Sequence, residues 1–385
     1  MAVGLKMQSA LVGGRKDEII LSDSVPVPQG PLRDHEIAVA VKAISLNPVD
    51  TKMLGEYNVE NAVLGCDYAG EVTAVGAAAA QKWGFHVGDR VAAMVIGMNS
   101  LRPGIGAFAQ HTVSPAWGAQ IIPDGWSYAE AAGGIGGVAW ITIPWALFHA
   151  MALPAGPLLE PLNSTFQPPT RLPNINIVTA HTENATKRPE HVLVSGGASY
   201  TGTCAIQLLK LAGFTVIATC SQRSFDSVRA FGADHVFDYN SETAADDIRA
   251  LARNCLHFAL DCITTPDTTK LCYAALGRSG GRYVAIDPYS EAVVSTRAVV
   301  HDDWVFGLEP LGDEIAWPAP HGRKPNPVAQ DFLQKWHPTM KSLINRGLIR
   351  SHPQSIRDGG LAGALNGIED IRQKRDGGKK LIYTL

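Results

Sequence analysis

The residues with the clearest chemical potential lie in a glycine-rich turn in the second half of the chain. The stretch HVLVSGGASYTGTCAIQLLKLAG reads as a buried strand, a turn that carries Gly196, Gly197 and Gly202, and a helix with one apolar face. Glycines in such a turn let the backbone approach a pyrophosphate, whose charge is stabilised at the helix N-terminus. Alone, the turn is also compatible with an ordinary packing motif, because it is not a regular GxGxxG. The alternation of strands and helices that follows favours a dinucleotide site.

The end of the next predicted strand indicates which dinucleotide binds. NAD sites usually carry Asp or Glu about 20 residues beyond the turn, where the carboxylate bonds the ribose hydroxyls. Here Cys220-Ser221-Gln222-Arg223-Ser224 ends the strand, and no carboxylate occurs before Asp226. Hydroxyl groups and a guanidinium suit a 2′-phosphate, so the sequence predicts NADPH. The alternative for Arg223 is a solvated residue at a helix start.

The chain offers few residues for a metal site. A catalytic zinc needs Cys, His or carboxylate ligands that converge. Cys66 and Asp67 are adjacent, but no His accompanies them, and the six cysteines form no CxxC pair. Most of these cysteines lie in apolar stretches, which is typical of reduced core cysteines in an intracellular protein. We therefore expect no metal.

Two kinds of domain are needed to position these residues. In the first part, short runs such as EIAVAVKAISL and GEVTAVG alternate with Gly, Asp and Pro, which predicts a barrel-like, partly open and partly antiparallel domain. From His191 onward the alternation predicts a doubly wound parallel sheet, so the fold class is α/β. We assign a catalytic domain, a Pro-rich connection, a dinucleotide domain and a return to the first domain to residues 1–152, 153–190, 191–325 and 326–385.

Composition argues against several classes of protein. The 385 residues are 46% hydrophobic and 18% charged, which suits a sizeable core. A net charge of −3 without a long basic run argues against a nucleic-acid binder. The start of the chain lacks the apolar segment of a signal peptide. The most apolar run, GGIGGVAWITIPWALFHAMALP, contains Gly and Pro and favours a buried domain junction over a membrane span. We expect a cytoplasmic protein without a membrane partner.

Longer motifs carry a more specific resemblance. The runs NPVDTKM, LGCDYAGEV, VGDRVAAM, IATCSQRSFDSVRAFGADHVFDY, FALDCIT, GRSGGRYVAIDPY and WPAP are spread almost end to end. Together they resemble the zinc-independent medium-chain dehydrogenases/reductases, and most closely the trans-acting enoyl reductases of fungal polyketide synthases. Zinc members of this superfamily carry a metal-binding Cys where this chain has Asp50, Thr51 and Lys52. The resemblance implies a GroES-like catalytic domain, a Rossmann domain, and hydride transfer from NADPH to the β-carbon of a carrier-bound α,β-unsaturated thioester.

The resemblance also implies a set of site residues. Lys52 would hold the nicotinamide ribose and influence nearby proton transfer, with Thr51 hydrogen-bonding beside it; the alternative for Lys52 is a solvated loop lysine. The implied cofactor contacts, from the ribose through the phosphates and the adenine to the nicotinamide side, are Val49, Asp50, Thr51, Lys52, Ala198, Ser199, Tyr200, Thr201, Ser221, Gln222, Arg223, Ser224, Tyr239, Leu276 and Gly277. The predicted substrate residues are Gly137, Trp140, Ala285, Ile286, Asp287, Pro288 and Tyr289.

Trp140 departs from the pattern of the resembled family. A threonine hydroxyl lies at the nicotinamide and the substrate in those enzymes, and a gapless alignment from Ser127 puts Trp140 at that place. An indole offers one donor and much more bulk, so it would narrow the cavity and remove an orienting hydrogen bond. The pocket could fit a different polyketide, Thr142 could supply the hydroxyl, or hydride transfer could be impaired. We expect that Trp140 lines the pocket and that hydride transfer survives.

The combined prediction is a monomeric trans-acting enoyl reductase. Its partner would be the acyl-carrier domain of a polyketide or polyketide–nonribosomal peptide synthase. One alternative is a quinone or enone reductase that acts on free small molecules with the same fold and cofactor. The other is a family member with impaired hydride transfer that serves as a synthase-binding, cyclase or isomerase protein.

Overall fold

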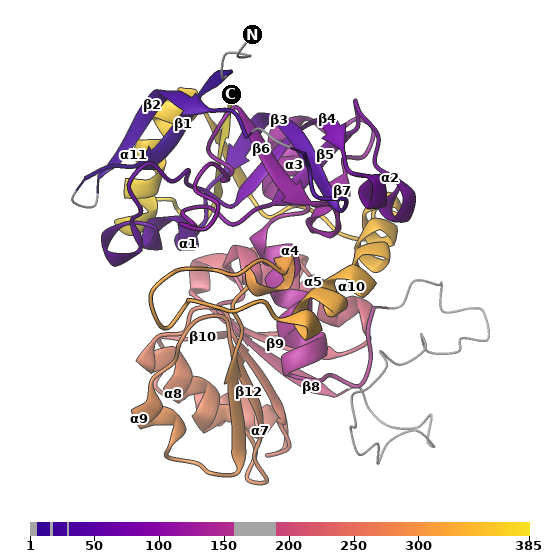
Figure 1. Ribbon diagram of the computed structural model, residues 1–385. Helices are drawn as coiled ribbons and strands as arrows, with labels where there is room; N and C mark the ends of the chain where they lie inside the picture. The colour runs from indigo at the N-terminus through magenta and orange to yellow at the C-terminus, as the bar shows by residue number, and fades with distance from the viewer. Residues whose placement is uncertain (1–5, 16–17, 29–30, 158–189) are drawn as a thin grey trace. The chain divides into compact units, whose positions relative to one another are not determined.

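The computed structural model describes residues 6–15, 18–28, 31–157 and 190–385. The chain divides into two compact units, a catalytic unit (Met1–Ile141 with Leu308–Leu385) and a dinucleotide unit (Thr142–Gly307), each of which is seen in Figure 1. Nearly all of the predicted Pro-rich connection lies outside the described residues.

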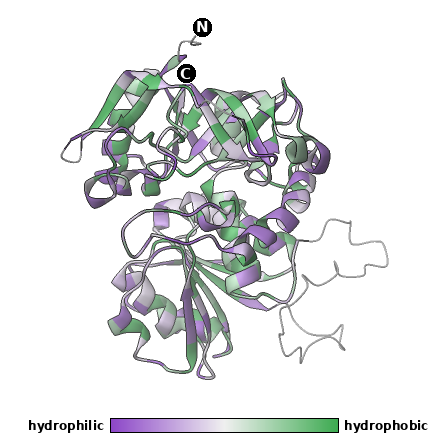
Figure 2. Cartoon of the chain, in the orientation of Figure 1, coloured by the Kyte–Doolittle hydropathy of each residue, from purple (hydrophilic) through white to green (hydrophobic). Residues whose placement is uncertain are grey.

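The dinucleotide unit is built on a six-stranded parallel sheet. Its strands lie in the order β10-β9-β8-β11-β12-β13, which is the 3-2-1-4-5-6 order of a doubly wound nucleotide-binding fold. The predicted α/β class and Rossmann sheet are therefore confirmed. The central strands β8 and β9 are mostly buried, and Figure 2 shows hydrophobic residues along the sheet. The strand bounds are β8 His191–Ser195, β9 Thr215–Cys220, β10 His235–Asp238, β11 Phe258–Asp261, β12 Gly281–Ala285 and β13 Val300–Trp304.

Helices connect these strands. The first, α5, begins after Ser199, whose hydroxyl accepts a hydrogen bond from the Gly202 amide, and the helix is buried without interruption from Gly202 to Leu209. This cap fixes the start of α5 at the carboxyl end of β8. The helices of the unit are α5 Tyr200–Leu211, α6 Phe225–Ala230, α7 Ala244–Leu251, α8 Pro266–Ala275 and α9 Glu291–Val294.

The catalytic unit contains a seven-stranded sheet and a separate hairpin. The path β14-β15-β3-β4-β5-β7 forms the sheet, with β6 also paired to β3, and β1 pairs with β2. The last strand, β15, lies antiparallel to β3 with Tyr383 opposite Ile44, so the end of the chain returns to the first domain as expected. The strands are β1 Met7–Gly13, β2 Ile19–Pro26, β3 Glu36–Ser45, β4 Asp67–Val75, β5 Arg90–Met94, β6 His111–Pro115, β7 Ala119–Ile121, β14 Gln354–Arg357 and β15 Lys380–Thr384.

Five helices of the catalytic unit accompany this sheet. The longest, α10, starts at Asn326, whose side chain accepts hydrogen bonds from the amides of Val328 and Ala329. Its His337 lies 2.9 Å from the Ala119 carbonyl oxygen, and burial lowers the pKa of His337 to about 4. The ring is therefore neutral at pH 7 and donates to that carbonyl. The helices are α1 Pro48–Lys52, α2 Ala77–Trp83, α3 Tyr128–Gly134, α10 Pro327–Asn345 and α11 Gly360–Arg372.

The apolar run over residues 128–150 is interrupted. After α3 the chain turns at Ile135–Gly137, continues as α4 (Val138–Pro144) and ends in a π-helical segment, Trp145–Ala150. By length and composition this run could cross a membrane, but 94% of its most apolar part is buried inside the protein. Core helices of globular proteins have the same length and composition, so the run carries little evidence for a membrane span.

A hairpin over residues 315–323, here called the WPAP hairpin, belongs to the catalytic unit and not to the dinucleotide unit predicted for it. Ile315 and Arg323 exchange two backbone hydrogen bonds that close it. The indole nitrogen of Trp317 donates to the Met98 carbonyl at 3.0 Å. These contacts tie the hairpin to the catalytic unit, which is why the observed boundary falls at Leu308.

A buried polar network joins distant segments of the catalytic unit. Asp67, at the start of β4, accepts hydrogen bonds from Asn47 Nδ2 at 2.8 Å, from the Val138 amide at 2.8 Å and from Lys380 Nζ at 3.0 Å. The Lys380 ammonium also donates to Asn47 Oδ1. Asn47, Asp67 and Lys380 are at most 4% exposed. Because an unpaired charge at such a depth is very costly, each partner depends on the others.

Asp50 belongs to the same network. Its Oδ2 accepts a 2.6 Å hydrogen bond from the Asn47 amide and so caps the first turn of α1. Burial, together with the nearby charge of Asp67, raises the pKa of Asp50 to about 7. Burial also raises the pKa of the nearby Cys66 thiol. The side chain of Asp50 therefore faces the interior of the catalytic unit.

Lys380→Met should destabilise the protein strongly. The substitution leaves the Asp67 carboxylate buried without its cation, a loss that typically costs about 3–5 kcal/mol. The neighbouring Lys379 is exposed, so Lys379→Met is a matched control expected to change stability by less than about 0.5 kcal/mol. Denaturant unfolding measures both. Equal stabilities of the two variants would contradict the importance of the buried pair.

Asp50→Asn should change how stability depends on pH. The pKa of Asp50 is higher in the folded protein, about 7, than its ordinary value of 3.8, so the folded state binds this proton more tightly. Its contribution to stability is therefore present below pH 4 and is lost as pH rises toward 7. Asp50→Asn should remove this loss when free energies of unfolding at pH 5 and pH 8 are compared. Asp226→Asn, at a fully exposed carboxylate, should keep it.

Candidate active site

The end of α1 places Lys52 at the surface of the catalytic unit. Its side chain is half-buried, and its Nζ lies 3.4 Å from Nε2 of His321 in the WPAP hairpin. The Thr51 hydroxyl donates to the Pro48 carbonyl at 2.7 Å, one turn back along the helix. Lys52 is therefore held by a specific neighbour, and its position follows from the cap of α1 described above.

The other two predicted residues on α1, Val49 and Asp50, differ from each other in burial. Asp50 is fully buried, and its carboxylate accepts a hydrogen bond from the Asn47 amide inside the catalytic unit. Val49 is partly buried. The predicted contact of this helix with a cofactor therefore depends on Val49, Thr51 and Lys52.

Gly137 lies against the Asp67 carboxylate. A Cβ atom at this position would lie 2.6 Å from Asp67 Oδ2, closer than real contacts allow. A glycine here lets the N-terminus of α4 reach the carboxylate, to which the Val138 amide donates. This close approach accounts for the glycine at position 137, and its predicted contact with the substrate stays a prediction.

Trp140 and Thr142 are both buried. The side chain of Trp140 is 1% exposed, and its Nε1 donates to the Gly134 carbonyl at 2.7 Å, so the single indole donor is used. Thr142 is 3% exposed, and a Cβ built on Gly307 would lie 1.8 Å from its hydroxyl oxygen. The role of Trp140 in lining a substrate pocket stays a prediction.

The glycine-rich turn of the dinucleotide unit has the shape that a pyrophosphate needs. Gly196 has φ +81°, and a Cβ on Gly202 would lie 2.2 Å from the Gly196 carbonyl oxygen. The hydroxyl of Ser199 donates to this carbonyl at 2.8 Å and lies 3.2 Å from the hydroxyl of Thr201. The turn is therefore compact, and the N-terminus of the twelve-residue helix α5 follows it directly. Ala198, Ser199, Tyr200 and Thr201 lie at this N-terminus, a favourable position for an anion.

Several other predicted residues lie at the same edge of the sheet. Because all six strands are parallel, the residues that follow β9, β10 and β12 share the carboxyl edge with the turn after β8. The predicted residues at this edge are Ser221, Gln222, Arg223, Ser224, Tyr239, Ala285, Ile286, Asp287, Pro288 and Tyr289. Tyr239 is 49% exposed, and the Tyr289 hydroxyl donates to Asp302 at 2.5 Å.

The two carboxylates near the end of β9, Asp226 and Asp238, contact neighbouring residues of their own segments. Asp226 is fully exposed and lies 3.6 Å from Arg229 on α6. Asp238, opposite Cys220 in the neighbouring strand, accepts from the Asn240 amide at 2.9 Å in the following turn. Ser221 and Ser224, in contrast, bring their hydroxyl oxygens within 3.5 Å of each other. The preference for a 2′-phosphate at this strand end stays a prediction.

Leu276 and Gly277 lie at the opposite edge of the sheet. They follow α8, which runs back from the carboxyl end of β11, and the Gly277 amide donates to the Leu256 carbonyl just before that strand. The structure therefore does not bring them together with the other predicted cofactor residues. The sequence around Leu276 and Gly277 does not show at which edge of the sheet they lie, because this depends on the direction of α8.

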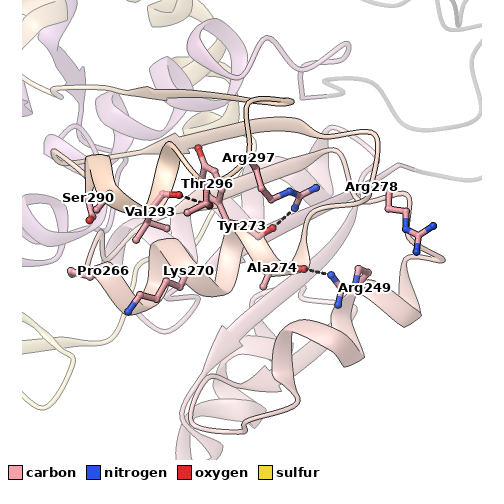
Figure 3. A pocket seen from close by; sticks show the side chains of 11 residues that line it. Arg249, Pro266, Lys270, Tyr273, Ala274, Arg278, Ser290, Val293, Thr296 and Arg297 are labelled. Carbon is pink, nitrogen blue, oxygen red and sulfur yellow. Dashed lines mark hydrogen bonds between the residues drawn. The ribbon is translucent and has the colours of Figure 1, made fainter.

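A groove of about 800 Å³ lies beside α8, and two of the arginines in its walls have structural roles (Figure 3). Arg249, Lys270, Arg278 and Arg297 contribute positive charge to its walls. The Arg297 guanidinium donates to the carbonyls of Leu276 at 3.1 Å and Gly277 at 2.6 Å, and Arg249 donates to Ala274 at 3.0 Å. These two arginines satisfy the carbonyl groups at the end of α8.

Two residues that contact the site, Lys380 and His321, were not identified from the sequence. Lys380 lies in an ordinary-looking final strand, and His321 lies in a Pro-rich stretch, and neither pattern indicates a buried polar partner. Asn47 could have been found, since Asn before Pro is a recognisable helix start. Among residues 6–15, 18–28, 31–157 and 190–385, no three His, Cys, Asp or Glu side chains gather as a metal site would require.

Comparisons with known proteins cover the same two regions. Residues 33–124 match the family model described as alcohol dehydrogenase GroES-like domain, and residues 201–302 match the one described as zinc-binding dehydrogenase. Among solved structures, the CurK enoyl reductase aligns with a TM-score of 0.69 at 18% identity, covering 98% of each chain. A mycobacterial protein solved with NADPH aligns with a TM-score of 0.68 at 20% identity, covering 99% of this chain and 100% of that one. Identities this low show the fold alone.

Much closer relatives are known from sequence. Trans-enoyl reductase cghC of Chaetomium globosum is 57% identical over 389 residues, and trans-enoyl reductase tasC of Hapsidospora irregularis is 57% identical over 385 residues. Each comparison covers all of both chains. A trans-enoyl reductase of Gibberella fujikuroi is 44% identical over 99% of each chain. The chain therefore belongs to the trans-enoyl reductases of fungal polyketide biosynthesis, within the medium-chain dehydrogenases/reductases.

Proposed function

We propose that this trans-enoyl reductase uses NADPH to reduce the α,β-double bond of a polyketide thioester carried by the acyl-carrier domain of a synthase. The observation that carries the proposal is 57% identity to trans-enoyl reductases over the full length of the chain. The compact turn between Gly196 and Gly202 supports a dinucleotide cofactor independently.

The cofactor would be held by residues at the carboxyl edge of the parallel sheet. Ala198–Thr201, at the start of α5, would bind the pyrophosphate through backbone amides. Ser221–Ser224 would bind the 2′-phosphate, and Tyr239 would stack beside the adenine. When bound, the nicotinamide supplies the hydride that reduces the β-carbon. Ala285–Tyr289, beyond the end of β12, would line the path of the substrate.

On the catalytic unit, Lys52 would serve as the charged group of the site. Its ammonium would hold the nicotinamide ribose and keep a proton available for the α-carbon, while Val49 and Thr51 would pack beside it. The thioester carbonyl of the substrate accommodates the negative charge that forms during reduction, so this chemistry does not depend on a metal. The partly buried position of Lys52 and its neighbour His321 support a role beyond solubility.

The partner and compartment follow from the same family assignment. We infer that the protein acts in trans as a monomer, in the cytoplasm, on chains delivered by the carrier domain of a separate synthase. A net charge of −3 without a basic stripe supports the expectation that nucleic acid is not a partner.

NADPH should bind at least about tenfold more tightly than NADH, a difference of roughly 1.4 kcal/mol. Charge-assisted hydrogen bonds from Arg223 and Ser221 to the 2′-phosphate can supply this much. Arg223→Ala should weaken NADPH binding about tenfold in calorimetry and leave NADH binding unchanged. Arg229→Ala, on the next helix, is the matched control and should alter neither. Equal affinities of the natural protein for the two nucleotides would overturn the assignment.

The purified protein should oxidise NADPH with carrier-bound enoyl thioesters at a much higher kcat/KM than with free enones or quinones. A carrier-independent rate would favour the quinone or enone reductase instead. Trp140→Thr tests the third possibility, because it restores the hydroxyl of the resembled enzymes. If the natural protein reduces no thioester in a panel and Trp140→Thr does, the natural protein has a binding, cyclase or isomerase role.

A further inference from the structure

The WPAP hairpin brings a histidine to the catalytic lysine. His321 Nε2 lies 3.4 Å from Lys52 Nζ, and His321 Nδ1 lies 2.9 Å from the Tyr57 hydroxyl. Lys52 ends α1, Tyr57 closes the 3₁₀ turn Gly55–Tyr57, and His321 comes from a segment 269 residues away from Lys52 in the chain. The three side chains form a continuous chain of polar contacts within the catalytic unit.

The chemistry of these contacts determines where the imidazole proton lies. A lysine ammonium has three donors and no acceptor, so Nε2 must present its lone pair to Lys52. The Nδ1 atom then carries the proton and donates it to the Tyr57 oxygen. Both ring nitrogens of His321 are therefore used, one toward each neighbour. The Lys52 ammonium sets the tautomer, and the Tyr57 hydroxyl, which can donate or accept, holds the other side of the ring.

The packing around His321 holds it in this position. His321 is 6% exposed and Tyr57 is 9% exposed. The ring of Tyr57 meets Trp317 edge-on at 5.5 Å and His321 edge-on at 5.6 Å. A Cβ on Gly322 would lie 2.3 Å from the Trp317 carbonyl oxygen, so the chain is tightly folded beside the histidine. The imidazole is thus preorganised by the protein itself.

We propose that His321, oriented by Tyr57, is a positioning residue that holds the Lys52 side chain in place for proton delivery to the substrate. This inference rests on the proposed function of Lys52. In the proton step an N–H bond of Lys52 breaks, a C–H bond forms at the α-carbon, and Lys52 becomes a neutral amine that regains its proton from water. His321 can hold both forms, because the opposite tautomer donates from Nε2 to the amine and accepts at Nδ1 from Tyr57.

Two substitutions of His321 separate positioning from simple packing. His321→Leu keeps an apolar side chain in the buried site but removes both polar contacts. His321→Gln can present its amide oxygen to Lys52 and its amide NH₂ to Tyr57, which reproduces the observed tautomer. We expect His321→Leu to lower kcat at least about tenfold with little change in KM for the thioester, and His321→Gln to recover most of the rate.

A solvent isotope effect reports on the proton step itself. In His321→Leu the ratio of kcat in H₂O to kcat in D₂O should rise, because proton delivery becomes slower relative to hydride transfer. Lys324→Met is the control, since this exposed lysine just beyond the hairpin pairs with Glu314, outside the polar chain, and its isotope effect should equal that of the natural protein. The melting temperature of each variant shows whether a lower kcat comes from unfolding of the protein.

The proposal would be overturned by a His321→Leu variant that melts normally and keeps its full kcat and isotope effect. A folded His321→Gln variant as slow as His321→Leu would also overturn it.

A measurement without substrate keeps this inference distinct from the proposed function. Long-range ¹H–¹⁵N spectra of the full chain should show His321 protonated at Nδ1, and Lys52→Met should perturb the Nε2 signal. A proton on Nε2 would contradict the arrangement whatever the enzyme reduces. If the spectra agree but no enoyl thioester is reduced, the pairing stands and the proposed function fails.

Discussion

The catalytic unit depends on one buried carboxylate. Asp67 is fully buried and accepts hydrogen bonds from an amide side chain, a lysine ammonium and the amide at the start of a helix. These donors come from three segments that are far apart in the chain: the loop before α1, the start of α4 and strand β15. Removing any one donor would leave charge or hydrogen-bonding capacity unsatisfied in the interior. The carboxylate therefore holds together the parts of the unit that carry the site.

The position of Lys52 follows from this network. Asn47 bonds to Asp67 and Lys380 through its side chain, and its backbone amide donates to Asp50. Asp50 thereby caps α1, and Lys52 ends that helix. From the other side, His321 contacts the Lys52 ammonium. The site lysine is thus fixed at both its backbone and its charged end by groups that do not themselves react, which is the arrangement that a precisely placed charge requires.

How much of this was predictable depends on how local each feature is. The alternation of strands and helices and the glycine-rich turn are patterns within about 30 residues, so the sequence predicted a doubly wound parallel sheet and its turn, while the strand order comes from the structure. Leu276 and Gly277 were placed beside the nicotinamide by resemblance, yet the direction of α8 takes them to the other edge of the sheet. The pairing of Asp67 with Lys380 spans 313 residues and leaves no local pattern. The boundary at Leu308 likewise depends on contacts of the WPAP hairpin with Met98, which no periodicity reveals.

The predicted residues of the dinucleotide unit and those of the catalytic unit are held in place by different kinds of structure. The glycine-rich turn, which is proposed to bind the cofactor, belongs to one strand–turn–helix segment, whose geometry is set by local glycines and a serine cap. The placement of Lys52 relies on side chains from the beginning, middle and end of the chain. A substitution at Lys380 can thus alter the placement of Lys52 through Asp67, Asn47 and α1, whereas a substitution at His321 alters it directly. The Trp140 indole hydrogen-bonds to the carbonyl of Gly134, at the end of α3, and the turn that follows leads to Gly137 beside Asp67. Because Trp140 is 1% exposed, Trp140→Thr leaves a space in the interior of the catalytic unit, and its effect on activity includes this loss of packing.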